Sequence, residues 1–243
     1  MKAMVLAAGL GTRLRPLTDT RPKALVELNG RTLLEITLER LRSFGVRQVV
    51  INAHHFAGML TEYLCAHQNF GMEIELSQES ELLDTGGGIK KVSDFFLRDG
   101  EPFLVHNVDV LSSIDLVALL RSHREHNAMA TLAVQHRVSR RQLLFDAAGL
   151  LCGRHTRGAD PEVVCPSESC EELAFCGVHV LSPAIFPRMD SDAAFSIVGT
   201  YLRLAGEGET IQAFRADGCY WRDLGTEASL RQAEAELTGG AIR

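Results

Sequence analysis

The sequence has no long apolar run, no closely spaced cysteine pair and no basic stripe, and each absence excludes a class of protein. No apolar run approaches the roughly 20 residues that a membrane-spanning helix needs, so no membrane segment or membrane partner is expected. The six cysteines include no C-x-x-C pair, which argues against a thiol-based zinc site. The formal net charge is -6, and no Lys/Arg stripe with interleaved aromatic residues occurs, so nucleic acid is not an expected partner.

The length and composition favour a single domain. The chain has 243 residues, of which 46% are hydrophobic, enough for a substantial core in one α/β domain. The short apolar run near Met1 ends at Gly9 and gives way to Arg13 and Arg15, which is typical of a buried first strand rather than a signal peptide. We therefore expect a cytoplasmic protein with one domain over 1–243, and nothing in the sequence indicates its oligomeric state.

The first part of the chain alternates strand and helix patterns. Strands are expected over 3–8, 46–52, 73–77 and 102–105, and helices over 33–44, 56–66 and 89–97. This alternation predicts a mostly parallel sheet flanked by helices.

After about residue 136 the pattern changes to one richer in β-structure. We expect a hairpin over 143–152, strands over 173–181, 210–216 and 219–222, and helices over 194–204 and 227–237. The polar segment 156–172 is expected to be a mobile loop. No linker separates the two parts.

A glycine-rich turn follows the first strand, in the run Ala7-Ala8-Gly9-Leu10-Gly11-Thr12-Arg13-Leu14. Such a turn exposes backbone N–H groups that can bind phosphate oxygens. It is not a Walker loop, because no lysine follows at the required spacing. It is not the dinucleotide fingerprint either, because Leu14 stands where that motif has its third glycine.

Cations and prolines are concentrated just after this turn: Arg13, Arg15, Pro16, Arg21, Pro22 and Lys23. A solvated surface loop is one interpretation. An anion site is favoured because the rest of the protein is acidic and because prolines reduce the entropy cost of holding the loop in place.

Two aspartates from distant parts of the chain lie at predicted strand ends. Asp109 follows the apolar strand near residue 105, and Asp223 lies between a strand and a helix. Magnesium typically takes one or two carboxylates plus substrate phosphates, which suits this pair. The residues alone leave an alternative open: Asp109 could cap a turn, and Asp223 could pair with Arg222 or cap the last helix.

The run Leu6-Ala7-Ala8-Gly9-x-Gly11-Thr12-Arg13-Leu14-x-Pro16-Leu17-Thr18, followed by Pro22-Lys23-x-Leu25 and Gly30, closely resembles the opening of the sugar-phosphate nucleotidyltransferases. Asn107-x-Asp109 resembles the N-G-D motif of that family, and Trp221-x-Asp223-x-Gly225-Thr226 resembles its W-x-D-x-G-T motif. The resemblance covers nearly the whole chain. It implies a Rossmann-like fold of the GT-A type with a smaller β-containing, sugar-binding part in the C-terminal half.

The resemblance also implies roles for individual residues. The catalytic residues are Arg13, Lys23 and Asp109, and Mg²⁺ is bound by Asp109 and Asp223. The nucleotide-binding residues are Leu6, Ala7, Ala8, Gly9, Gly11, Thr12, Arg13, Glu79, Thr85 and Gly86. The residues expected at the sugar phosphate are Gly87, Asn107, Gly177 and Asp223. The halves 1–136 and 137–243 would bind the nucleotide and the sugar, respectively.

Several positions depart from the family pattern. Val108 replaces a small residue, Cys176 replaces a hydroxyl residue, and the E-K-P lysine of some relatives is absent. Two alternatives are open for that lysine: Arg154 or Arg157 replaces it, or no residue does. Asp84 before Thr85-Gly86-Gly87-Gly88-Ile89 looks more like the N-acetylmuramate 1-phosphate uridylyltransferases.

The implied substrates are a nucleoside triphosphate and a sugar 1-phosphate, with UTP and N-acetylmuramate 1-phosphate or a similar hexose 1-phosphate as the leading pair. The alternatives are a guanylyltransferase for mannose or heptose 1-phosphate, a cytidylyltransferase for a phosphorylated alcohol, and a nucleotide-binding regulatory subunit without catalytic activity.

Overall fold

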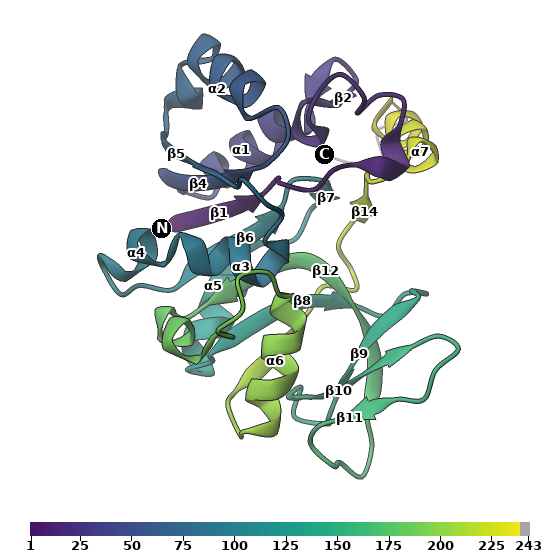
Figure 1. The fold of residues 1–243 in the computed structure, drawn as a ribbon. Helices are drawn as coiled ribbons and strands as arrows, with labels where there is room; N and C mark the ends of the chain where they lie inside the picture. Colours follow the sequence, from purple (N-terminus) through teal and green to yellow (C-terminus); the bar gives the residue numbers. More distant parts are fainter. Residues whose placement is uncertain (239–243) are drawn as a thin grey trace. The chain divides into compact units, whose positions relative to one another are not determined.

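The computed structural model describes residues 1–238 and confirms an α/β fold in which helices flank a mixed, mostly parallel sheet (Figure 1). The chain forms two compact units. Unit 1 comprises Met1–Leu82, His106–Ser113 and the segment from Tyr220 onward, and unit 2 comprises Leu83–Val105 and Ile114–Cys219. Each unit contains residues from both expected halves, so the assignment of nucleotide and sugar binding to 1–136 and 137–243 stays a prediction.

Unit 1 contains the elements β1 (Lys2–Leu6), η1 (Thr12–Leu14), η2 (Lys23–Leu25), β2 (Glu27–Leu28), β3 (Arg31–Thr32), α1 (Leu33–Ser43), β4 (Gln48–Ala53), α2 (Ala57–Ala66), η3 (Gln68–Gly71), β5 (Glu73–Gln78), β7 (Val110–Ser112), β14 (Trp221–Asp223) and α7 (Glu227–Thr238).

The parallel strands β1, β4 and β5 organise this unit. Leu6 pairs with Asn52, and Asn52 pairs with Ser77, so the carboxyl ends of all three strands lie at one edge. β1 and β4 are buried along most of their length, which is why they appear in the sequence as continuous apolar runs. Binding sites in open α/β sheets form at this edge, and the glycine-rich loop leaves β1 there.

Unit 2 contains α3 (Asp84–Lys91), α4 (Ser93–Leu97), α5 (Leu116–Glu125), β8 (Ala130–Gln135), β9 (Arg141–Phe145), β10 (Leu151–Thr156), β11 (Glu162–Val163), β12 (Glu171–Leu181), η4 (Pro183–Arg188), α6 (Ile197–Gly206) and β13 (Ile211–Arg215). β6 (Phe103–Asn107) divides between the two units after Val105. Within unit 2 the strands β11, β10, β9, β12, β8 and β13 pair in that order, antiparallel except for β8 with β13.

Three sequence predictions need correction. The helix expected over 89–97 is two helices, α3 and α4, which meet at Val92, where the backbone leaves the helical conformation (φ -105°, ψ 19°). The loop expected over 156–172 contains β11, because Glu162 pairs with Arg154 across the hairpin. No element was expected between 106 and 136, where the chain forms β7, α5 and β8.

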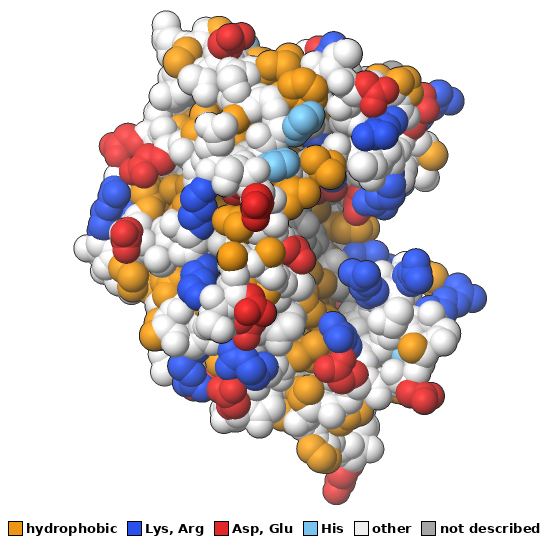
Figure 2. All heavy atoms as spheres, in the orientation of Figure 1, with side chains coloured by type: hydrophobic (Ala, Val, Ile, Leu, Met, Phe, Trp, Pro, Cys, Tyr) orange, Lys and Arg blue, Asp and Glu red, His pale blue; other side chains and the backbone are white. Residues whose placement is uncertain are grey.

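Two further features of the structure concern the charged surface and the length of the helices. On the face shown in Figure 2, Lys and Arg side chains are interspersed with Asp and Glu and do not gather in one stripe. Among residues 1–238, no helix is long and apolar enough to cross a membrane.

Candidate functional site

The glycine-rich loop of unit 1 is fixed by Gly11. This residue is in the left-handed region (φ 62°, ψ 28°) and precedes η1. A Cβ atom at Gly11 would lie 2.8 Å from Thr18 Cγ2 and 3.2 Å from Lys23 Cβ, so a side chain would be strained and crowded. The Gly11 carbonyl accepts hydrogen bonds from Thr18 Oγ1 at 2.9 Å and from the Leu14 N–H at 2.8 Å. The loop therefore has a defined conformation that depends on glycine.

The other predicted loop residues differ in exposure. Ala7 and Ala8 are buried at 5% and 8% exposure, and Leu6 is half-buried at the end of β1. Gly9, Thr12 and Arg13 are exposed. A ligand in solution can therefore reach the tip of the loop, while its base belongs to the core.

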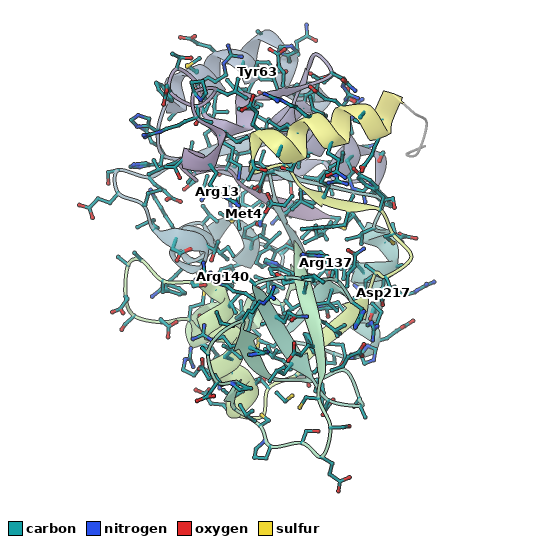
Figure 3. The ribbon with its side chains drawn as sticks, turned by 90° about the vertical axis from the view of Figure 1, so that its right-hand side faces the viewer. Met4, Arg13, Tyr63, Arg137, Arg140 and Asp217 are labelled. Atoms are coloured by element: carbon teal, nitrogen blue, oxygen red, sulfur yellow. The ribbon has the colours of Figure 1, made fainter. Side chains whose placement is uncertain are left out.

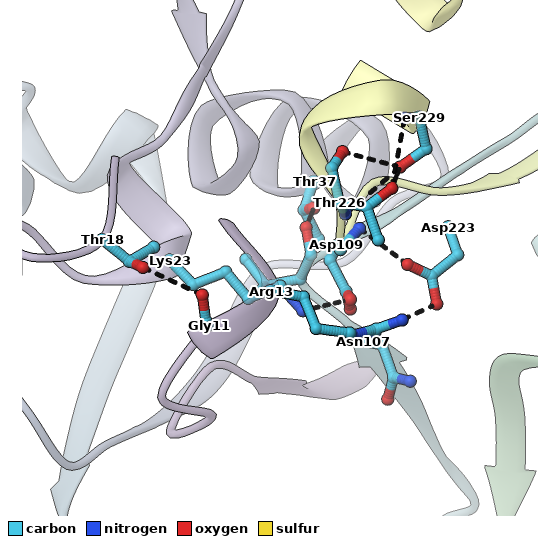
Figure 4. Close-up of polar contacts among 12 residues, drawn as sticks. Gly11, Arg13, Thr18, Lys23, Thr37, Asn107, Asp109, Asp223, Thr226 and Ser229 are labelled. Atoms are coloured by element: carbon cyan, nitrogen blue, oxygen red, sulfur yellow. Dashed lines mark hydrogen bonds and ion pairs between the residues drawn. The ribbon is translucent and has the colours of Figure 1, made fainter. Parts of the chain in front are cut away.

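Lys23 and Asp109 form a largely buried ion pair between Nζ and Oδ2 (Figure 4). Their side chains are only 14% and 13% exposed, so salt screens this pair much less than a surface pair. Lys23 is the first residue of η2, and Pro22 before it fixes the entry of the chain. Asp109 lies in the turn between β6 and β7. Two of the predicted catalytic residues are thus in direct contact.

Asp223 is brought to Asp109 by strand pairing. β14 runs antiparallel to β7, with Asp223 opposite Val110, and the Leu224 N–H donates to the Asp109 carbonyl at 2.8 Å. Arg13 Nη2 lies 3.9 Å from Asp223 Oδ2. The backbones of the two aspartates are therefore tied together, although they are far apart in the sequence.

Gly225 shows that the two carboxylates face one point. A Cβ atom built on this glycine would lie 2.6 Å from Asp223 Oδ1, 2.7 Å from Arg13 Nη2 and 3.3 Å from Asp109 Oδ2. The Gly225 N–H donates to Asp223 Oδ1 at 2.6 Å, which fixes the orientation of that carboxylate. Two carboxylate oxygens and one guanidinium nitrogen converge here.

Asp223 neither pairs with Arg222 nor caps the last helix, the two alternative roles that the sequence left open. Arg222 pairs instead with Glu236 of α7, with Nη2 and Oε1 2.6 Å apart. The start of α7 is capped by Thr226, whose Oγ1 accepts from the Ser229 N–H at 3.2 Å. Asp223 therefore faces Arg13 and the neighbourhood of Asp109.

A small polar cluster fastens β14 to α7. Arg222 Nη1 donates to Gln232 at 2.8 Å, and the Tyr220 hydroxyl donates to Glu236 Oε2 at 2.7 Å. The hydrogen bonds from Tyr220 and Arg222 hold the pKa of Glu236 below its usual value. This cluster fixes the strand that ends in Asp223.

His106 and Asn107 are the last two residues of β6, just before the turn that holds Asp109. Asn107 is the last residue of β6 and is half-buried. His106 is fully buried, and its Nδ1–H donates to the Asn107 carbonyl at 2.8 Å. Burial lowers the pKa of His106 to about 4, so the ring is neutral at pH 7 and adds no charge beside Asp109.

Glu79 is not at the surface. It is 2% exposed, and its Oε1 accepts a hydrogen bond at 2.7 Å from the amide of Asn52, another buried residue. Contact between Glu79 and a nucleobase stays a prediction. No role for Asn52 was predicted from the sequence. The one sign of such a role is that a polar residue ends the apolar run Val49-Val50-Ile51.

The remaining predicted residues belong to unit 2. Gly86 and Gly87 lie in the first turn of α3, and their N–H groups donate to the Phe195 carbonyl at 2.8 and 3.4 Å. A Cβ on Gly86 would lie 2.2 Å from the Phe195 ring, and one on Gly87 would lie 2.1 Å from the Ala193 carbonyl. Thr85 Oγ1 accepts from the Ile197 N–H at 3.0 Å. Segment 193–197 therefore packs on these N–H groups, and contact of Thr85, Gly86 or Gly87 with a substrate stays a prediction.

Gly177 lies in an irregular part of β12. Its φ is 71°, and the register of β12 against β8 shifts between Phe175 and His179. Arg137, which is labelled in Figure 3, donates to the Phe175 carbonyl at 2.8 Å. Burial raises the pKa of the adjacent Cys176 thiol to about 12, so this side chain is neutral at pH 7 and packs as a small apolar group.

Neither arginine proposed to replace the absent lysine is shown at a phosphate site. Arg154 forms an ion pair with Glu162, with Nε and Oε2 2.6 Å apart. The backbone N–H of Arg157 donates to the Arg140 carbonyl at 2.9 Å. Replacement of the lysine by either residue stays a prediction.

The residues at Gly225 fit a hard divalent cation. Asp109 Oδ2 and Asp223 Oδ1 both lie within 3.3 Å of one point, and both are carboxylate oxygens, the ligands that Mg²⁺ prefers. Within residues 1–238, no group of three or more His, Cys, Asp or Glu side chains is arranged to hold a metal alone. Two carboxylates suffice for Mg²⁺ where substrate phosphates supply further oxygens.

Comparisons with known proteins identify the family of the chain. The family model for nucleotidyl transferases matches residues 2–142. The chain is 34% identical to an N-acetylmuramate alpha-1-phosphate uridylyltransferase of Caulobacter vibrioides, over 97% of this chain and 96% of that one. It is 30% identical to a mannose-1-phosphate guanyltransferase of Yarrowia lipolytica, over 93% of this chain but only 61% of the relative.

A solved structure supports the fold. HddC from Yersinia pseudotuberculosis, crystallised as a complex with GMP-PN, superposes with a TM-score of 0.77, covering 97% of this chain and 99% of that one at 21% identity. The likeness at this identity concerns the fold alone. Together with the family model and the relatives, it leads to one conclusion: the chain is a member of the nucleotidyl transferase family of enzymes.

Proposed function

We propose that the protein transfers a nucleoside monophosphate from a nucleoside triphosphate to a sugar 1-phosphate and releases pyrophosphate. The observation that carries this proposal is the convergence of Asp109, Asp223 and Arg13 at Gly225, with Lys23 on Asp109. These groups lie in the same unit as the glycine-rich loop. The relatives named above act on sugar 1-phosphates, which supports the same substrate class here.

The reaction requires two polyanions to meet. An oxygen of the sugar 1-phosphate attacks the α-phosphorus of the triphosphate, the bond from that phosphorus to the β-phosphate oxygen breaks, and pyrophosphate leaves. The second pKa of a phosphate monoester is about 6, so the attacking oxygen is already largely anionic at pH 7. A general base is therefore unnecessary.

Charge balance is the main task of the side chains. Lys23 and Arg13 carry positive charge to the carboxylates of Asp109 and Asp223, where they can also meet phosphate oxygens that approach the same point. We propose that Asp109 and Asp223 bind Mg²⁺, which would neutralise phosphate charge and align the substrates. The loop from Gly9 to Thr12 and Arg13 would hold the triphosphate.

The leading substrates are UTP and N-acetylmuramate 1-phosphate or a similar hexose 1-phosphate. The match to the Caulobacter uridylyltransferase supports this pair, because it extends over 97% of this chain and 96% of that one. GTP with mannose or heptose 1-phosphate is the second candidate, supported by the match to the guanyltransferase. A non-catalytic subunit is disfavoured, since Lys23, Asp109 and Asp223 are all present and assembled.

A substrate matrix tests the proposal. Pyrophosphate release is measured for the four ribonucleoside triphosphates and dTTP, each combined with a panel of sugar 1-phosphates and Mg²⁺. We expect the highest kcat/KM for UTP with N-acetylmuramate 1-phosphate. A maximum for GTP with mannose or heptose 1-phosphate would support the second candidate. Triphosphate binding without pyrophosphate release for any pair would contradict transferase activity.

A further inference from the structure

A buried amide links the glycine-rich loop to Glu79. Asn52 of β4 is 3% exposed. Its Oδ1 accepts a hydrogen bond from the Ala7 N–H at 2.7 Å, and its Nδ2 donates to Glu79 Oε1 at 2.7 Å. A backbone N–H can only donate and a carboxylate oxygen accepts, so these partners fix which end of the amide points to the loop. Both contacts are buried.

The position of Ala7 makes this contact important for the loop. Ala7 follows the last residue of β1, Leu6, whose partner in the parallel ladder is Asn52 itself. The Ala7 N–H is thus held by a side chain at the point where the loop leaves the sheet. A buried N–H without an acceptor is costly, so this hydrogen bond defines the direction of the loop.

Glu79 is a rigid support for the amide. Its N–H donates to the Ala53 carbonyl at 2.7 Å, and its own carbonyl accepts from His54 Nδ1 at 2.9 Å. Its side chain is 2% exposed. The carboxylate therefore holds the amide of Asn52 in one orientation, and the amide in turn holds Ala7.

We propose that Asn52 is a positioning residue for nucleotide binding: through the Ala7 N–H it fixes the start of the phosphate-binding loop, and Glu79 holds its amide in place. The proposal rests on the proposed function, because it takes this loop to bind the triphosphate. The proposal differs in one prediction from the alternative that Asn52 and Glu79 contact the nucleobase directly. We call the hydrogen bonds that join Ala7, Asn52 and Glu79 the relay. Its loss should weaken the binding of all nucleotides equally, because the loop contacts the phosphates that they share.

The first test removes both hydrogen bonds with Asn52→Leu. We expect the Kd for UTP and for GTP, measured by calorimetry, to rise by the same factor of about ten, because a buried N–H and a buried carboxylate lose their partner. In turnover assays, KM for the nucleotide should rise while kcat changes less. Unchanged affinity, or a loss confined to one base, would overturn the proposal.

The second test exchanges the two groups. Asn52→Asp alone places two carboxylates against each other and should weaken nucleotide binding at least as much as Asn52→Leu. The double variant Asn52→Asp/Glu79→Gln keeps the net charge, because the new amide at position 79 donates to the new carboxylate at position 52, which still accepts from Ala7. We expect the double variant to regain most of the nucleotide affinity that Asn52→Asp loses. A double variant as weak as the single one would contradict the relay, and this test remains available if Asn52→Leu does not fold.

The other end of the same strands offers a matched control. Gln48 of β4 donates to Glu73 of β5 with Nε2 and Oε2 2.6 Å apart, an amide–carboxylate pair that is exposed and remote from the loop in register. Gln48→Leu and Gln48→Glu/Glu73→Gln should leave nucleotide affinity unchanged. Calorimetry separates this proposal from the proposed function: if the wild type binds nucleotide but releases no pyrophosphate, the transferase proposal fails, while the affinities of the Asn52 variants still decide the role of Asn52.

Discussion

Replacing Gly225 by alanine is a sharp test of the proposed metal site, because it adds one methyl group at the point where the charged groups converge. The new Cβ would lie 2.6 Å from Asp223 Oδ1, 2.7 Å from Arg13 Nη2 and 3.3 Å from Asp109 Oδ2. The φ of Gly225 lies outside the left-handed region, so alanine adopts this backbone without strain. The perturbation is therefore one of space at the site.

The size of the effect follows from what can move. The Arg13 guanidinium is the end of a flexible side chain that is 65% exposed, so it can withdraw at little cost. The Asp223 side chain is short, and its Oδ1 accepts a hydrogen bond from the Gly225 N–H. The new methyl group therefore forces this carboxylate to move away from its present position. A misplacement of about 1 Å in a catalytic group can lower the rate about 100-fold. We expect kcat/KM to fall by about that factor.

The global stability should change little. The reduced entropy of the unfolded chain stabilises the variant by about 0.4–1 kcal/mol, which offsets part of the roughly 1–3 kcal/mol that overpacking typically costs. For a protein of this size, 1 kcal/mol shifts Tm by about 2–4 °C. Loss of activity with a nearly unchanged Tm would locate the effect at the site.

The assay is pyrophosphate release as a function of Mg²⁺ concentration, with Gly58→Ala as the control. Gly58 lies in α2, and a Cβ there would meet nothing within 4 Å, so this variant should keep full activity and gain about 0.5–1 kcal/mol of stability. For Gly225→Ala we expect a higher Mg²⁺ requirement as well as a lower rate. Wild-type kcat/KM and Mg²⁺ dependence would refute the idea that cation and substrate meet at this point.

Further predictions concern charge. Asp109→Asn and Asp223→Asn should each abolish Mg²⁺-dependent turnover while circular dichroism and Tm show an intact fold; turnover in either variant would contradict its role as a metal ligand. Lys23→Ala should lower kcat by about 100-fold if the lysine stabilises the transition state, whereas a rise in KM alone would assign it to ground-state binding. Burial lowers the pKa of His123 to about 4 from 6.5, so His123 is neutral in the folded protein and favours the folded state above pH 6.5. As the pH falls from 6.5 towards 4, unfolding takes up a proton and up to about 3 kcal/mol of stability is lost. Urea denaturation at both pH values should show a smaller loss for His123→Gln, in which an amide can still bond to Thr131; an equal loss would count against this assignment.

The sequence predicts those parts of the site in which a chemically distinctive residue stands at the end of a recognisable strand. Asp109 follows β6 and Asp223 is the last residue of β14, and a pair of carboxylates at strand ends is a recognisable metal signal, although their role as metal ligands stays a prediction. The glycine at position 11 was recognisable because cations and prolines follow it. The ion pair between Lys23 and Asp109 adds a contact that the motifs alone do not state.

Other features could not be read from local patterns, because distant residues decide them. The resemblance places Gly86 at the nucleotide, yet the Phe195 ring and carbonyl occupy its surroundings. Asn52 looked like an ordinary end of a strand until its two buried hydrogen bonds were visible. The break at Val92 is hidden by apolar residues that continue the helical spacing on both sides.

The pairing of β7 with β14 has a consequence for how activity arises during synthesis. A nascent chain that has emerged as far as β7 already carries the glycine loop, Lys23 and Asp109, but the strand bearing Asp223 is made only after all of unit 2. Closing this long-range contact requires ordering a large intervening segment, which slows its formation relative to local structure. If the glycine loop binds the triphosphate and Asp223 binds the metal, as proposed, nucleotide affinity should appear earlier during synthesis than catalysis.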